Sequence, residues 1–495
     1  MRDSLFHIKK NEYTTLQGQI REFLVSAILE GRLDPEEPLP STRKMAKIIS
    51  VSRNTVVLAY QALVDDGYLE SRSRSGFYVS AKIMDGRQAP APALPAAEPR
   101  ERVSWAERLR IAPAAQENID KPLDWQSYEY PFIYGQVDHA LFPIAEWREC
   151  SRQSLSKRWL GSWTNDTWGY DDPILIEQIR RRLLPRRGIH ATEDQIMVTL
   201  GAQNALYIVA SLLISDQTTV AIEEPGYPDV RNNCRLKTNR VVPINVDAYG
   251  MPVSAMLNGC DVAFLTPSHQ FPTTVTMPMD RRQQLLDKAS AEDFIIVEDD
   301  YEFETNYVGE ACPSLKSMDT ADRVIYIGSL SKSLFPGLRL GFMVGPAELI
   351  AEARALRRLM VRHAPNNNQR TAALFLALGH HDALINRLHR IYRERWQIMG
   401  RALQTHMPDS SRIPSFGGTA YWVWGPPDLD SDELALAAAE RGILIEPGRI
   451  HFAAHDAPRN FFRLGFSSIP EERIEPGIEL LAEVVREQMA AVAAE

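Results

Sequence analysis

The residues with the clearest chemical potential lie in GSLSKSLFPGLRLGF, residues 328–342. Lys332 follows the apolar run RVIYIG and is accompanied by three serines and an arginine: Ser329, Ser331, Ser333 and Arg339. A Schiff-base lysine needs a sheltered position, where a lowered pKa keeps its amine unprotonated. Hydroxyl groups and an arginine fork bind phosphate. The segment predicts a Schiff-base lysine beside a phosphate, although a lysine between small polar residues is, taken alone, usually solvated.

Three other segments supply the remaining groups of such a site. Gly201-Ala202-Gln203 lies between a strand pattern and a helical pattern, where free backbone N–H groups suit a phosphate. Tyr227, in EEPGYP, follows a strand pattern and can lay its ring on a pyridine face. In EDDYEF (298–303), an aspartate can pair with a protonated pyridine nitrogen and a tyrosine with a phenolic oxygen. Taken singly, an aspartate of EDDYEF is equally explained as an ordinary acid at a strand end, and Tyr227 as an aromatic ring packed in the core.

Short buried strands must position these groups. The runs QIMVTLG, TVAIEEP, DVAFLTPS, FIIVEDDY, RVIYIGS and LRLGFMVG are apolar and alternate with helical patterns between residues 121 and 488. Continuous apolar strands that alternate with helices indicate an α/β domain with a mainly parallel sheet.

A different pattern occupies residues 13–82. Apolar residues on one helical face of 16–28 predict a first helix, and Ser41 and Ser52 are N-cap residues for a second and a third. Gly67-Tyr68-Leu69 ends the third helix, and two short strands joined by a polar turn at 73–76 form a wing. The alternative interpretation is a small helical domain that contacts protein.

In a helix-turn-helix, the first residues of the second helix of the motif face the major groove, where arginine pairs with guanine and asparagine with adenine. Arginines of the wing are placed to touch phosphates or the minor groove. The predicted DNA-contacting residues are Arg43, Ser52, Arg53, Asn54, Thr55, Arg72, Arg74 and Gly76.

Composition separates the two regions. Residues 83–120 begin with a Pro/Ala-rich run that predicts an extended linker. The net charge is -9, yet residues 1–82 hold 12 basic and 10 acidic residues, so the acidity lies in the rest of the chain. The four cysteines are scattered and no histidine cluster has metal-ligand spacing, so we expect neither disulfides nor a metal. Without an apolar leader or an 18-residue apolar stretch, we expect a cytoplasmic protein with no membrane contact.

Two resemblances follow from these motifs. LPSTRKMA, VSRNTVVLAY and DGYLESRSRSGFYV resemble the winged helix of GntR-type regulators in order and spacing. Residues from about 120 to 488 resemble fold-type-I pyridoxal phosphate aminotransferases, and TPSHQFPTTVTMP (266–278) is especially similar to the MocR/GabR subfamily of GntR regulators. The resemblance implies a multidomain chain, a winged helix fused to an α/β aminotransferase-like domain, that binds pyridoxal 5′-phosphate, operator DNA and a small amino compound as a homodimer.

The resemblance also implies residue roles. Lys332 forms the aldimine with the cofactor, and Arg463, in FFRLGFSS, holds the α-carboxylate of an amino-acid ligand. The other cofactor contacts are assigned to Gly201, Ala202, Gln203, Tyr227, Asp299, Tyr301, Ser329, Ser331 and Arg339. Either Asp299 or its neighbour Asp300 pairs with the pyridine nitrogen, and the sequence leaves that choice open.

The chain departs from the family at four positions. After Tyr170, whose contact with a partner subunit is thereby in doubt, Asp171 and Leu175 replace two expected glycines. Thr274 stands where glycine is more usual. Asp229 replaces a second arginine found in relatives that bind γ-aminobutyrate, so it either repels a second carboxylate or points to solvent.

The function expected from these features is regulation of transcription by an amino compound that forms an external aldimine in place of Lys332. The IYGQVDHALFP segment and Asp229 resemble the corresponding residues of the subgroup that regulates the catabolism of ectoine or related amino acids. The alternatives are an active aminotransferase with a DNA-binding head and a regulator that senses pyridoxal phosphate itself. We expect no sustained aminotransferase turnover, because a DNA-binding domain in the same chain can report the binding of an amine at Lys332.

Overall fold

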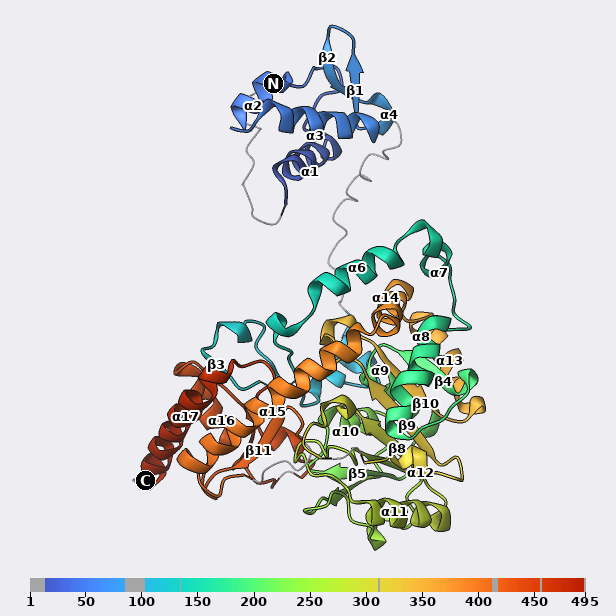
Figure 1. Ribbon diagram of the computed structural model, residues 1–495, viewed down its shortest axis with the longest axis vertical. Coiled ribbons are helices and arrows are strands. Elements are labelled where there is room, and N and C mark those ends of the chain that lie inside the picture. The colour runs from blue at the N-terminus through green and yellow to red at the C-terminus, as the bar shows by residue number, and fades with distance from the viewer. Residues whose placement is uncertain are drawn as a thin grey trace. The chain divides into compact units, whose positions relative to one another are not determined.

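The computed structural model describes residues 14–84, 103–133, 135–309, 312–411, 417–454 and 456–493. Its contacts divide the chain into two compact units, Met1–Arg108 and Leu109–Glu495, each described here by itself (Figure 1). Tyr13 and residues 85–102, the first part of the predicted linker, lie outside the described residues. None of the described helices combines the length and the hydropathy that crossing a membrane requires.

The first unit is the predicted winged helix. Three helices precede a two-stranded antiparallel wing: α1 (Leu16–Leu29), α2 (Thr42–Ile48), α3 (Arg53–Asp65), β1 (Leu69–Arg72) and β2 (Gly76–Val79). The hydroxyl of Ser41 accepts from the Lys44 amide and that of Ser52 from the Thr55 amide, so both serines cap the helices they were predicted to cap. Residues from all three helices and both strands share one apolar core.

The second unit is built on a seven-stranded sheet, and it confirms the predicted α/β class. Only β10 is antiparallel to its neighbours. In spatial order the strands are β4 (Ile196–Thr199), β10 (Gly341–Val344), β9 (Val324–Ser329), β8 (Ile295–Asp300), β7 (Val262–Leu265), β5 (Val220–Glu224) and β6 (Val241–Asn245).

Helices cover both faces of this sheet, which explains why its strands carry apolar residues on both faces. One apolar core joins the sheet to α9 (Ala202–Leu213), α10 (Pro228–Arg235) and α13 (Ala347–Val361). A second core, on the other face, joins it to α11 (Met279–Glu292) and α12 (Leu315–Met318). Successive strand residues therefore point into different cores, as Ile296 and Val297 do on β8.

The C-terminal part of this unit carries a smaller antiparallel sheet of order β11-β14-β13. Its strands are β11 (Ala420–Trp424), β14 (Phe461–Gly465) and β13 (Glu446–Pro447). Four helices share an apolar core with it: α14 (Asn366–Ala377), α15 (His380–His406), α16 (Ser431–Glu440) and α17 (Glu471–Val492). Before the large sheet come α6 (Ile144–Ser154), α7 (Leu160–Thr164), α8 (Pro173–Gln178) and β3 (Tyr130–Pro131), which pairs with β12 (Ile443–Leu444).

Two segments differ from the sequence-based expectation. Residues 109–120, assigned to the linker, pack with the second unit, where the Asn232 side chain donates to the Glu117 carbonyl at 2.8 Å. Asp171, at an expected glycine position, is buried and accepts from Arg354 and Arg357 at 2.6 Å each and from the Val198 amide at 3.0 Å. Its carboxylate ties this segment to α13 and β4, a function that glycine could not perform.

Candidate functional site

The predicted cofactor residues meet where the parallel strands end. In an open parallel sheet, ligands bind outside the carboxyl ends of the strands. There the structure has a cavity of about 520 Å³ lined by Lys332 and by eight of the nine predicted contacts: Ala202, Gln203, Tyr227, Asp299, Tyr301, Ser329, Ser331 and Arg339. Gly201, the ninth, caps α9 and lies against the Arg339 guanidinium.

Gly201 and Arg339 form a cradle at the start of α9. Gly201 has a φ of 80°, and a Cβ there would lie 3.4 Å from the Arg339 guanidinium carbon. The guanidinium is held by a 2.9 Å hydrogen bond to the Leu200 carbonyl. The amide groups at the helix start and this arginine suit a phosphate. Any side chain at position 201 would fill the cradle.

Burial changes the protonation of the central residues. It lowers the pKa of Lys332 to about 7, and the charge of Lys121 adds to the effect. Burial, with a contribution from Asp300, raises the pKa of Asp299 to about 7. The Lys332 amine is therefore substantially unprotonated near neutral pH, which is the form that attacks a carbonyl carbon.

Asp299 and Asp300 point to opposite faces of β8, because strand residues alternate. Asp299 lines the cavity, and its buried Oδ1 has no hydrogen-bond partner among the described residues. Asp300 instead accepts from Arg187 at 2.7 Å and from the Tyr326 hydroxyl at 2.9 Å. The geometry favours Asp299 for the pyridine nitrogen.

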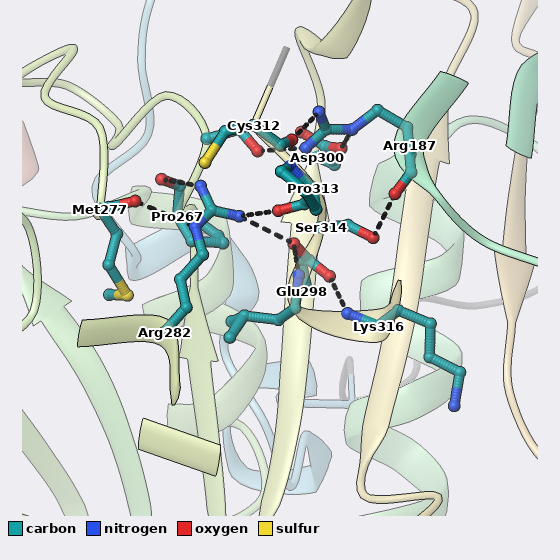
Figure 2. A network of polar contacts seen from close by, with 12 residues as sticks. Arg187, Pro267, Met277, Arg282, Glu298, Asp300, Cys312, Pro313, Ser314 and Lys316 are labelled. Carbon is teal, nitrogen blue, oxygen red and sulfur yellow. Dashed lines mark hydrogen bonds and ion pairs between the residues drawn. The ribbon is translucent and has the colours of Figure 1, made fainter. Parts of the chain in front are cut away.

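Figure 2 shows the polar network on the Asp300 side of β8. Arg187 also donates to the Cys312 carbonyl and to the Ser268 hydroxyl, both at 2.6 Å. Arg282 donates to three carbonyls and lies 3.9 Å from Glu298, and both side chains are completely buried. Arg187 and Arg282 thus pair with Asp300 and Glu298, the two acids on one face of β8.

The residues present fit a pyridoxal phosphate. The cradle at Gly201 and Arg339 suits the phosphate, and Ser331 Oγ is buried without a partner among the described residues. Tyr227 donates to Gln203 at 3.3 Å and presents its ring to the same cavity. The partnerless oxygen of Asp299 is available to the ring nitrogen.

Sequence reasoning missed several residues of the cavity. Asn118 and Ile119 line it from the end of the segment assigned to the linker, and Lys121 and Gln136 line it from the start of the following domain. Gly135 has a φ of 76°, and a Cβ there would lie 2.7 Å from Lys332 Nζ. No periodicity or motif marks these positions in the sequence.

The departures from the family have structural consequences. Asp229 is half-buried and lines the cavity, so it does not simply point to solvent. Thr274 has a φ of 63°, the left-handed backbone that favours the glycine usual at this position. Arg463 is 1% exposed, and the described residues that line the cavity do not include it.

The first unit exposes the residues predicted to contact DNA. Arg53 and Asn54 are exposed on the first turn of α3, and Thr55 is half-buried behind Ser52. Arg43 is exposed on α2. On the wing Arg72, Arg74 and Gly76 are exposed, and the Arg72 guanidinium lies 4.2 Å from the centre of the Tyr78 ring.

Comparisons with known proteins agree with both units. Residues 16–79 match the model of bacterial regulatory proteins, gntR family, and residues 134–481 match aminotransferase class I and II. The chain is 42% identical to the HTH-type transcriptional regulator TauR of Rhodobacter capsulatus, over 95% of this chain and 97% of that protein. It is 31% identical to the probable rhizopine catabolism regulatory protein MocR of Rhizobium meliloti, over 94% of this chain and 93% of that one.

The second unit is also similar to a solved structure that contains a cofactor. Kynurenine aminotransferase of Pyrococcus horikoshii, in complex with PMP, superposes with a TM-score of 0.68 and 27% identity over 78% of this chain and 95% of that one. The aminotransferase domains to which this unit is similar bind pyridoxal phosphate. The chain belongs to the MocR-type transcription regulators of the GntR family, which join a DNA-binding winged helix to an aminotransferase class I and II domain.

Proposed function

We propose that this regulator senses a small primary amine, which takes the place of the Lys332 amine on the cofactor and thereby changes DNA binding. The observation that carries the proposal is the complete cofactor constellation around Lys332 in a chain that also exposes Arg53 and Asn54 on a recognition helix. Pyridoxal phosphate, when bound, supplies an aldehyde carbon that accepts an amine and a ring that withdraws electrons from it.

The residues of the cavity prepare this exchange. Lys332 offers an unprotonated amine near neutral pH because it is buried. Asp299 would hold the ring nitrogen, Tyr301 the phenolic oxygen, and Ser329, Ser331 and Arg339 the phosphate. Once freed by an effector amine, the Lys332 amine would be a buried base with a pKa of about 7, so its contacts and its protonation would change when the effector binds.

The experiment compares the wild-type chain with Lys332→Ala on DNA that the full chain itself has enriched from a random library. A panel of diamino and ω-amino acids, including those derived from ectoine, is added to the pyridoxal phosphate complex. We expect an active amine to change wild-type DNA affinity by about 5- to 150-fold. Lys332→Ala should bind the same DNA without responding.

The controls separate the alternatives. A Lys332→Ala protein that still responds to the amine would show that the sensing proposal is wrong. Sustained turnover with an amino donor and a keto acid would favour an active aminotransferase, for which the same constellation is sufficient. A change of DNA affinity on addition of pyridoxal phosphate alone would favour a sensor of the cofactor.

A further inference from the structure

Arg463 lies opposite an acid in the small C-terminal sheet. In the antiparallel pair of β13 and β14, Glu446 and Arg463 are direct cross-strand neighbours. The two side chains are almost completely buried, and Arg463 Nη1 lies 3.8 Å from Glu446 Oε1. The same Glu446 oxygen lies 3.2 Å from His451 Nε2. Arg463 therefore has a carboxylate of the protein itself within ion-pair distance.

Glu446 carries its charge at neutral pH. Burial alone would raise its pKa, but the hydrogen bond from His451 and the charge of Arg463 outweigh burial and hold the pKa at about 2. Burial lowers the pKa of His451, so this histidine adds no positive charge at neutral pH. The charge of Glu446 thus opposes the charges of Arg463 and Lys121, and its burial strengthens both interactions.

Phe271 covers Arg463 on the cavity side. The guanidinium carbon lies 4.2 Å from the centre of the Phe271 ring, and Phe271 lines the cavity whereas Arg463 is not among its described lining residues. The ring is held by edge contacts with Tyr227 and His451, with centroids 5.1 and 5.2 Å apart. A ligand carboxylate would have to displace this ring to reach the guanidinium.

We propose that Glu446 is a specificity-determining residue that neutralises Arg463, so that the cavity selects primary amines with no carboxylate on the amino-bearing carbon. A carboxylate placed at Arg463 would also approach Glu446, and their repulsion would offset the attraction of the arginine. The inference removes the α-carboxylate role that the family resemblance implies for Arg463. This inference rests on the proposed function, in which the ligand amine replaces the Lys332 amine on the cofactor.

The test uses two stable mimics of cofactor plus ligand, N-(5′-phosphopyridoxyl)-L-alanine and N-(5′-phosphopyridoxyl)ethylamine. They differ only by the carboxylate on the amino-bearing carbon, and neither exchanges with Lys332. Calorimetry measures their dissociation constants with the full-length, cofactor-free chain, and the readout is the ratio of the two. A purely structural effect of a substitution weakens both mimics and leaves this ratio unchanged.

For the wild type we expect the L-alanine mimic to bind no more tightly than the ethylamine mimic. Glu446→Gln removes the charge at constant shape and should improve the L-alanine mimic at least tenfold relative to the other. Glu446→Asp keeps the charge and should keep the wild-type ratio. A wild type that binds the L-alanine mimic tenfold more tightly, or a Glu446→Gln protein with an unchanged ratio, would overturn the inference. If no amine changed DNA binding, the proposed function would be contradicted, but the ratio of the two dissociation constants could still be measured and would still test the role of Glu446.

Discussion

At the scale of single residues, the proposed attachment of the cofactor to Lys332 depends on the protonation of its amine. An ordinary lysine has a pKa of about 10.4, so its amine is almost fully protonated at neutral pH. Burial first, and then the charge of Lys121, lowers the pKa of Lys332 to about 7. Lys121 therefore contributes to the protonation state of the proposed Schiff-base lysine.

This shift makes a prediction for the rate of cofactor attachment. Below pH 7 the amine is mostly protonated, so the rate should rise about tenfold per pH unit, and above pH 7 it should level off. The measurement is the visible absorbance of the cofactor-free chain after mixing with pyridoxal phosphate. Lys121→Met should move the midpoint to higher pH. A wild-type rate that continues to rise to about pH 10 would show that Lys332 titrates like an exposed lysine.

At the scale of elements, β8 gives two adjacent carboxylates different tasks. Among the described residues, Asp299 Oδ1 has no hydrogen-bond partner, and Asp299 lines the cavity. Asp300 accepts a hydrogen bond from Arg187, within the network of Figure 2, and another from the Tyr326 hydroxyl. Removing one partner of a buried ion pair leaves the other charge uncompensated, which costs about 3–5 kcal/mol. Among the described residues Asp299 has no such ion pair, and its burial favours the neutral form.

We therefore predict that two isosteric substitutions affect different properties, one the stability of the fold and the other the binding of the cofactor. Asp300→Asn should lower the free energy of unfolding of the cofactor-free chain by about 3 kcal/mol. Asp299→Asn should change it by less than about 1 kcal/mol while weakening pyridoxal phosphate binding at least about tenfold. Urea unfolding followed by tryptophan fluorescence, and cofactor titration, measure the two effects. Equal stability losses in the two variants would contradict this division of tasks.

The same strand shows what a sequence can and cannot reveal. The apolar runs and the caps at Ser41 and Ser52 are local signals, so the α/β class and the winged helix were predictable. Strand alternation predicts that Asp299 and Asp300 face opposite ways, but which one faces the cavity depends on the helices that cover each side. The roles assigned to the individual site residues stay predictions.

Other parts of the site depend on contacts between distant segments. Lys121 reaches the cavity from a stretch without periodicity. Gly135 lies next to Lys332 in space although nearly two hundred residues separate the two in the sequence. Glu446 meets Arg463 only because β13 and β14 pair in one register. A motif search finds Arg463 and misses the acid that opposes it, because the two are brought together by tertiary structure alone.

At the scale of the whole molecule, the second unit exposes an apolar surface at the end of α13. Leu359 is 84% exposed, and Met360 and Val361 beside it are also exposed. Trp168 lies next to this helix end, since the Arg358 guanidinium is 4.0 Å from the centre of its ring. Exposed apolar side chains that gather in this way mark interaction surfaces. We propose that this surface forms the homodimer that the family resemblance implies.

A dimer would let two winged helices read two half-sites, which a monomer cannot do. Leu359→Asp places a charge in the proposed interface and should weaken dimerisation by roughly 2 kcal/mol, or about 30-fold in the dissociation constant. Sedimentation velocity over a concentration series measures this shift. Leu436→Asp is the matched control, because Leu436 on α16 is 72% exposed and lies outside this surface. If both variants dimerise like the wild type, the dimer uses another face. If only Leu359→Asp dissociates, it should also bind two-half-site DNA no more tightly than DNA with one half-site, because the tethering of the two heads is lost.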